Sequence, residues 1–126
     1  MQKLSTVVSS VAHKTSPAGD AWVSASLSFQ GLKALGVPQE SLESFPPEFQ
    51  QGMAARAYEL GDTGESSPEN WEKPLGTQDV HVVLTALSPN EQKLESVIER
   101  AKKIYQELQG IKAIWRQNCY ASATGK

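Results

Sequence analysis

The stretch that decides the fold is DVHVVLTALSPNEQKLESVIERAKKIYQELQG, residues 79–110. Its first nine residues alternate in character with a period of two, which is typical of a strand that has one buried face. The predicted apolar face carries Val80, Val82, Leu84 and Ala86. The opposite face carries His81, Val83 and Thr85.

A capping box follows this strand. Ser88 is the predicted N-cap, with Pro89 at the first helical position and Glu91 at the third. Apolar residues then recur at helical spacing up to Gly110, and they are Leu94, Val97, Ile98, Ala101, Ile104, Tyr105 and Leu108. We expect this helix to lie on a sheet with its charged face in solvent.

Two more strands are expected. WVSASLSF (22–29) alternates cleanly, and its predicted inner face carries Val23, Ala25, Leu27 and Phe29. IKAIWRQNCYAS (111–122) alternates less cleanly and is predicted as the last strand.

Between the first two strands the chain is predicted to be helical and then irregular. GLKALGVP (31–38) reads as one helical turn closed by Gly36 and Pro38. A helix is expected from Pro47 to Gly61. The residues predicted to line one side of this helix are Phe49, Met53, Arg56, Ala57 and Leu60. Residues 62–77 have no periodicity and are predicted as a surface loop.

The N-terminal stretch MQKLSTVVSSVAH superficially suggests a signal peptide. Serine and threonine dilute its apolar part, and a short amphipathic helix is favoured, followed by a loop at 14–20. The whole order is α+β. It is nearly the βαββαβ ferredoxin-like unit, an antiparallel sheet with helices on one face, with its first strand missing. We expect a single, partial domain over residues 1–126, with an insertion at about 31–77.

Composition excludes several classes of protein. The 126 residues amount to one domain, with 39% hydrophobic and 21% charged residues, as in globular proteins. The net charge of −2 and the absence of a basic patch make nucleic acid an unlikely partner. No apolar run is long enough to cross a membrane. The single Cys119 excludes an internal disulfide and fits a reducing compartment, so a cytoplasmic location is expected.

Several residues are candidates for chemistry. His81 is a candidate ligand or base, and Cys119 a candidate nucleophile, but a structural role is favoured for both. A cation site in the loop is outweighed by a solvated acidic surface, because calcium-loop spacing is missing. The acidic residues concerned are Asp62, Glu65, Glu69 and Glu72.

Arg56 is predicted on an apolar helix face and therefore needs a partner. A salt bridge to Glu59 or Asp62 is favoured over a charge that faces another domain. Packing is likewise favoured over a redox role for three aromatic residues, Trp71, Trp115 and Tyr120.

The order of these segments resembles the dye-decolourising haem peroxidases. In that family a strand leads into a GL-x-x-LG turn, an F-x-x-GM-x-x-R-x-x-x-LGD helix, and a strand reading roughly VHVLL. The matching residues here are Gly31, Leu32, Leu35 and Gly36; Phe49, Gly52, Met53, Arg56, Leu60, Gly61 and Asp62; and Val80, His81, Val82, Val83 and Leu84, with Trp71 between the last two groups. The resemblance covers nearly the whole chain and implies a ferredoxin-like half-molecule.

The resemblance also implies haem b and peroxide-dependent oxidation of dyes or phenols in a complete family protein. The family's GxxDG segment, whose aspartate lies on the distal side of the haem, should begin just after residue 126. Its proximal histidine lies further on, and neither His13 nor His81 matches it. The chain is therefore expected to be an internal segment of such a peroxidase. It is expected to have no catalytic, cofactor-binding or metal-ligating residues of its own and to bind no haem alone.

Two other functions stay open. A non-enzymatic, oligomerising module would arise because the missing first strand leaves backbone groups unpaired, so that a second copy or the haem-bearing segment is the expected partner. A dimeric ferredoxin-like monooxygenase would need a polar pocket over the sheet, whereas the predicted inner faces are apolar.

Overall fold

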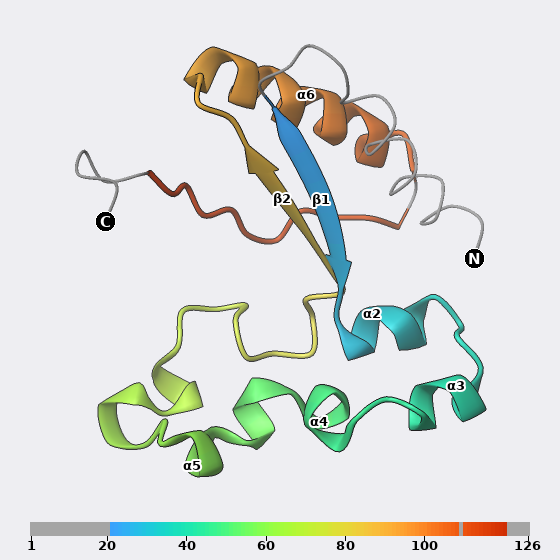
Figure 1. The fold of residues 1–126 in the computed structure, drawn as a ribbon, viewed down its shortest axis with the longest axis vertical. Coiled ribbons are helices and arrows are strands. Elements are labelled where there is room, and N and C mark those ends of the chain that lie inside the picture. The colour runs from blue at the N-terminus through green and yellow to red at the C-terminus, as the bar shows by residue number, and fades with distance from the viewer. Residues whose placement is uncertain (1–20, 109, 121–126) are drawn as a thin grey trace.

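The computed structural model describes residues 21–108 and 110–120. Two antiparallel strands and one long helix form an upper layer, and a set of short helices lies beyond one end of the strands (Figure 1). In chain order the elements are β1 (Trp22–Leu27), α2 (Phe29–Ala34), α3 (Gln39–Glu43), α4 (Pro47–Ala55), α5 (Ala57–Leu60), the 3-10 turns Gly64–Ser66 and Pro68–Asn70, β2 (Val82–Leu87) and α6 (Glu91–Gln106). The α+β class is confirmed. The predicted helix at the N-terminus and the loop at 14–20 lie outside the described residues.

The alternation predicted for β1 is confirmed. In β2, which begins at Val82 and not at Asp79, Leu84 of the predicted inner face is 37% exposed, so the alternation there is confirmed only in part. In β1 each half-buried residue is followed by an exposed one, so that Val23, Ala25 and Leu27 share a face. The register sets Val23 opposite Ala86 and Leu27 opposite Val82, which keeps the apolar side chains of both strands on that face. Phe29 is not part of the strand, because α2 begins there.

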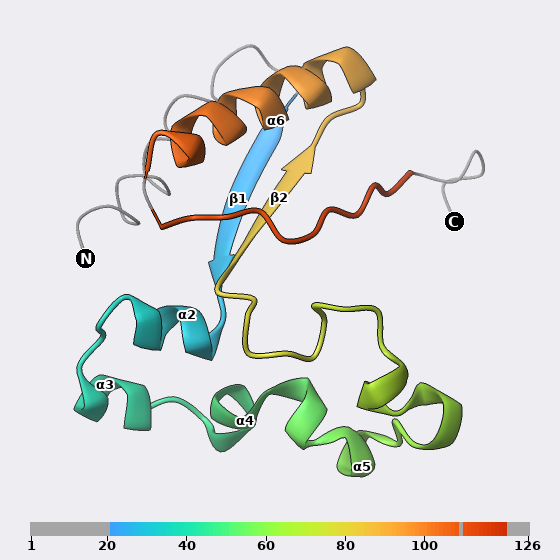
Figure 2. The same ribbon diagram turned by 180° about the vertical axis from the view of Figure 1, so that it is seen from behind.

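Helix α6 covers this face of the sheet. Its predicted apolar stripe is confirmed, with Val97 and Ala101 buried. Ala101 packs with Val23 of β1 and with four further side chains, those of Ile104, Tyr105, Leu108 and Ile111. Seen from behind, α6 lies in front of the strands (Figure 2). Among the described residues no helix or strand covers the other face, so that face of the sheet is bare in the described chain.

The predicted start of α6 is wrong by two residues. Asn90, and not Ser88, is the N-cap, and its side chain accepts a hydrogen bond from the backbone N–H of Lys93 at 3.0 Å. The Ser88 hydroxyl accepts one from the backbone N–H of Asn90 at 3.1 Å. Serine therefore shapes the turn before the helix, and asparagine caps it.

The single helix predicted from Pro47 to Gly61 is also wrong. Gly52 has φ 76° and ψ 171°, which interrupts α4, and Arg56 separates α4 from α5. Residues that were predicted to share one face therefore do not, and Met53 and Leu60 are 62% and 46% exposed. The predicted end at Gly61 is confirmed, with φ 81° and backbone bonds back to Ala57 and Tyr58 across the turn.

The third strand predicted at 111–122 is wrong for residues 111–120, and the remainder lies outside the described residues. The sheet formed by the described chain has two strands. Residues 111–120 run across the strands on the side of α6 instead of pairing beside them (Figure 2). In ferredoxin-like order another strand would lie between β2 and this segment, and the described residues form no such strand, so the segment has no described neighbour to pair with. The predicted domain limits, with an insertion at about 31–77, stay a prediction.

One junction joins the insertion to the sheet. Ser28 caps α2, and its hydroxyl accepts a bond from the N–H of Gly31 at 3.0 Å and donates one to the carbonyl of Val80 at 2.6 Å. The backbone N–H of Ser28 donates to the carbonyl of His81 at 3.1 Å. Gly31 is buried against the same carbonyl, where a Cβ would overlap the oxygen. This contact joins the end of β1 to the residues that directly precede β2.

Replacing Gly31 tests this junction. Gly31→Ala places a methyl group against backbone, which cannot move aside without disturbing the Ser28 bonds, so we expect a loss of about 1–3 kcal/mol in the free energy of unfolding. Urea denaturation followed by circular dichroism measures it. Gln30→Ala, in the same helix, is the matched control and should unfold near the wild-type midpoint. Equal midpoints for Gly31→Ala and the wild type would contradict the close approach.

Candidate functional site

His81 contributes its backbone to the structure. It directly precedes β2, its carbonyl receives the N–H of Ser28, and the residue is exposed. Within residues 21–108 and 110–120, no three histidine, cysteine, aspartate or glutamate side chains gather to hold a metal ion. The backbone of His81 therefore takes part in the junction between β1 and β2. In the described chain no other side chain lies with it to form a metal site.

Arg56 forms the predicted salt bridge with Glu59, at 3.1 Å between Nε and Oε2. Both residues are close to the surface, with side chains 26% and 65% exposed. A pair of this kind, three residues apart along the chain, contributes little to stability because water screens it. Arg56 is thus satisfied locally.

The acidic loop is organised by its own polar groups. The side-chain nitrogen of Asn70 donates to the carbonyls of Gly64 and Glu65 at 3.2 and 3.3 Å. The indole N–H of Trp71 donates to the carbonyl of Ser66 at 2.7 Å. The Trp71 ring lies on Gly76, where an added Cβ would be 2.6 Å from the ring. This loop has a defined conformation although it has no long helix or strand.

Glu69 titrates in this loop. Hydrogen bonds to its carboxylate, first from its own backbone N–H and then from Ser67, lower the pKa of Glu69 below 4.5, and Lys73 adds to the effect. Because the folded pKa is lowered, these interactions are fully present above pH 4.5 and are lost as pH falls through the folded value. Glu69 is fully exposed, so the effect is local.

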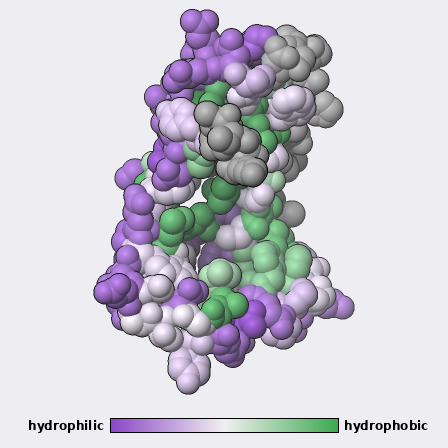
Figure 3. Space-filling model, turned by 60° about the vertical axis from the view of Figure 1, so that its left-hand side comes forward, coloured by the Kyte–Doolittle hydropathy of each residue, from purple (hydrophilic) through white to green (hydrophobic). Residues whose placement is uncertain are grey.

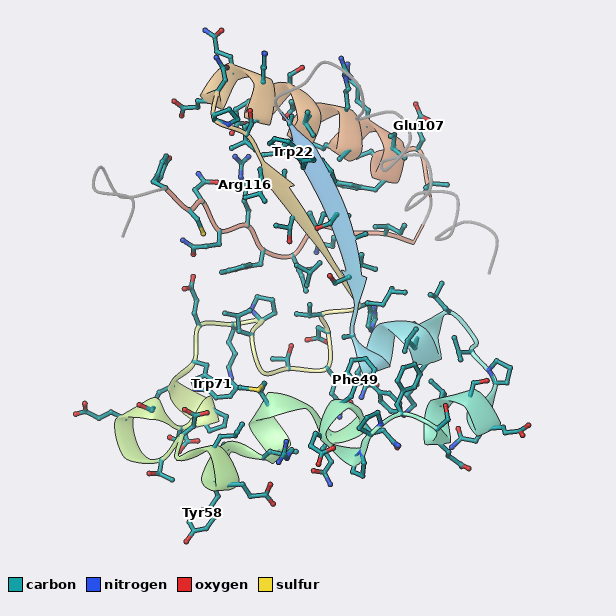
Figure 4. All side chains as sticks on the ribbon, viewed as in Figure 1. Trp22, Phe49, Tyr58, Trp71, Glu107 and Arg116 are labelled. Carbon is teal, nitrogen blue, oxygen red and sulfur yellow. The ribbon has the colours of Figure 1, made fainter. Side chains whose placement is uncertain are left out.

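The last described segment is tied to both layers. Trp115 donates from its indole nitrogen to the Glu72 carboxylate at 3.3 Å. Arg116 pairs with Glu95 of α6, and this hydrogen bond raises the pKa of the Arg116 guanidinium. Figure 4 shows Arg116 on the segment between the layers and Trp71 in the lower one. Cys119 has a free, exposed thiol, and Tyr120 is 80% exposed.

Sequence reasoning missed three of these contacts. The cap at Ser28 had a local signal, because serine directly before a helix-forming stretch favours an N-cap. The Trp115–Glu72 and Arg116–Glu95 contacts join residues 43 and 21 positions apart and have no such signal.

The bare face of the sheet, opposite α6, carries large apolar side chains that are exposed. Trp22, at the α6 end of β1 (Figure 4), is 64% exposed, and Leu87 directly opposite is 62% exposed. Val83, opposite Ser26, is 48% exposed. Viewed from another side, hydrophobic side chains gather at the waist of the molecule around a hollow between the layers (Figure 3). Exposed apolar groups that gather in this way mark surfaces where other molecules bind.

Comparison with protein families identifies the family of this chain. The family model described as the DyP dimeric alpha+beta barrel domain matches residues 2–118. The chain belongs to this family. It corresponds to the N-terminal half of DyP-type proteins, as the resemblance in sequence implied. No curated protein matches the chain.

The match places residues 111–118 inside the DyP domain. The segment that crosses the sheet without pairing therefore belongs to the family's domain and is not an appendage. Among the helices of the described chain, none is both long and apolar enough to cross a membrane.

The hydrogen bonds of Glu69 can be tested by titration. In the folded DyP domain we expect the Glu69 carboxyl to titrate with a midpoint below 4.5, measured by carbon-detected NMR. Ser67→Ala removes a hydroxyl that contributes to the lowered pKa and that also donates to the Gly64 carbonyl at 2.7 Å, and it should raise the midpoint. Ser44→Ala, which removes a hydroxyl bonded to the Ser41 carbonyl in α3, is the control and should leave it in place. A midpoint that Ser67→Ala does not move would contradict the assigned hydrogen bond.

Proposed function

We propose that this chain is the N-terminal scaffold half of a DyP-type haem peroxidase and is not catalytic by itself. In the complete protein the reaction is the reduction of hydrogen peroxide, coupled to the oxidation of dyes or phenols. The observation that carries the proposal is the family match over residues 2–118, together with a sheet that has one bare face.

The described residues do not fit haem b. A haem ligand in such an enzyme reaches the iron inside a pocket that controls access to it. His81 is exposed and its backbone carbonyl is bonded to Ser28, and no second ionisable side chain is held beside it by a contact in the described chain. The proposal therefore assigns the haem and its chemistry to a different segment of the complete protein.

The role proposed for this half is to support that segment. The exposed side chains of Trp22, Val83 and Leu87 form an apolar strip on the face opposite α6. Sheets bury such strips against a second layer. The partner would be the haem-bearing segment or another copy of the chain, and the description of the family as a dimeric alpha+beta barrel supports a second α+β unit in this place.

Titration with hemin tests the catalytic part of the proposal. We expect the purified chain to give the broad spectrum of free hemin, with no peroxide-dependent dye oxidation above that of hemin alone. A sharp Soret band with turnover would overturn the proposal. His81→Ala is then the decisive variant, since loss of that band would identify His81 as the ligand.

The neighbouring coding sequence provides an independent test. The proposal requires a GxxDG segment and a histidine-bearing haem domain to follow residue 126 in the gene or in a partner gene. A gene that encodes neither, in a cell whose DyP domain is purified without haem, would favour the purely oligomerising module.

A further inference from the structure

The insertion meets the sheet at a narrow neck. Its chain leaves β1 at Ser28 and returns at Val80 and His81, and the hydroxyl and backbone N–H of Ser28 bind the carbonyls of those two residues. The contact is close, because Gly31 lies against the His81 carbonyl with no room for a Cβ. Two bodies that are joined through a few residues at one place can rotate about them, as in hinged proteins.

A second contact lies away from this neck. The indole N–H of Trp115 donates to the Glu72 carboxylate at 3.3 Å. Trp71, which directly precedes Glu72, lies at the opposite end of the lower layer from α3 (Figure 4). A small rotation of the insertion about the neck would therefore separate the indole from the carboxylate.

Glu72 is attached to the rest of the insertion. The neighbouring indole of Trp71 donates to the Ser66 carbonyl at 2.7 Å. A Cβ added to Gly76 would lie 2.6 Å from the Trp71 ring and 3.7 Å from the Cβ of Ala54, so the loop packs against the end of α4. A displacement of Glu72 is thus passed on to α4.

Trp115 is attached to the sheet layer in the same way. The guanidinium of the next residue, Arg116, donates to both carboxylate oxygens of Glu95 in α6. At the start of the segment, Ile111 packs with the cluster around Ala101. Neighbouring residues of one segment therefore reach opposite layers, Trp115 the insertion and Arg116 the helix.

We propose that the insertion is a hinged lid over the hollow between the layers, with the Ser28 neck as its hinge and the Trp115–Glu72 hydrogen bond as its latch. Figure 3 shows this hollow with hydrophobic side chains around it. The latch is a single bond near the surface, where water competes for both groups. It opens at a lower free energy than the neck, which has several bonds and a buried glycine, and its opening gives access to the apolar side chains.

Distances between spin labels test the lid. In a Cys119→Ser background, labels on Gln51→Cys of α4 and Ser96→Cys of α6, both exposed positions, report the separation of the two layers by double electron–electron resonance. Trp115→Phe keeps an aromatic ring and removes the donor, so we expect the distance distribution to broaden and its maximum to move to longer distance. Glu65→Ala, which removes a charge of the same loop outside the latch, is the control and should leave the distribution unchanged.

Two variants of Glu72 separate the hydrogen bond from the charge. Glu72→Gln keeps a carbonyl acceptor and should give the distribution of the parent, whereas Glu72→Ala should behave like Trp115→Phe. Amide hydrogen exchange checks the hinge, since the N–H of Ser28 should stay protected in Trp115→Phe. Circular dichroism checks that every variant folds.

A distribution that Trp115→Phe leaves unchanged, or that Glu65→Ala changes equally, would overturn the proposal. Loss of Ser28 protection in Trp115→Phe would overturn it as well, because the neck would then open together with the latch. These measurements need no haem. Their failure would leave the supporting role proposed above in place, and a haem-active chain would leave the lid in place.

Discussion

The rest of the structure depends on the hydrogen-bonded junction at Ser28. One hydroxyl caps α2 and holds the carbonyl of Val80, while the adjacent backbone N–H holds the carbonyl of His81. Because these bonds join the end of β1 to the start of β2, they align the two strands although Ser28 and Val80 lie 52 positions apart in the chain. Gly31 allows the close approach, since a side chain there would meet the His81 carbonyl. Closing a long loop costs little more entropy than closing a moderate one, so a few well-placed bonds suffice.

The same junction keeps the insertion away from the face of the sheet opposite α6 in the described chain. It directs the insertion beyond the end of the strands, where Leu42 is buried and the ring of Phe49 contacts those of Phe29 and Phe45. This part of the chain does not turn back onto the sheet. With α6 on one face and no described element on the other, apolar side chains stay in solvent, as expected of half of a larger assembly. The supporting role proposed for this DyP domain rests on that exposed face.

The polar groups of three candidate residues are paired with partners in the described chain. Arg56 pairs with Glu59, the indole of Trp71 with a carbonyl of its own loop, and Trp115 with Glu72. Each pairing satisfies a polar group close to where the chain places it, and none assembles a nucleophile, base and orienting group. The functional interest of the described chain therefore lies in its surfaces.

By itself the sequence determined the elements whose signals are local. The alternation of β1, the apolar stripe of α6 and the end of α5 at Gly61 were predicted, because side-chain period and glycine conformation act within a few residues. The Arg56–Glu59 pair was predicted for the same reason. The family was predicted from the order and spacing of its motifs. Tertiary structure alone decided the rest. Gly52 breaks a helix that its neighbours favour, because a positive φ there is open to glycine. Residues 111–120 have strand character but form no strand, since pairing needs a neighbour that local sequence cannot supply.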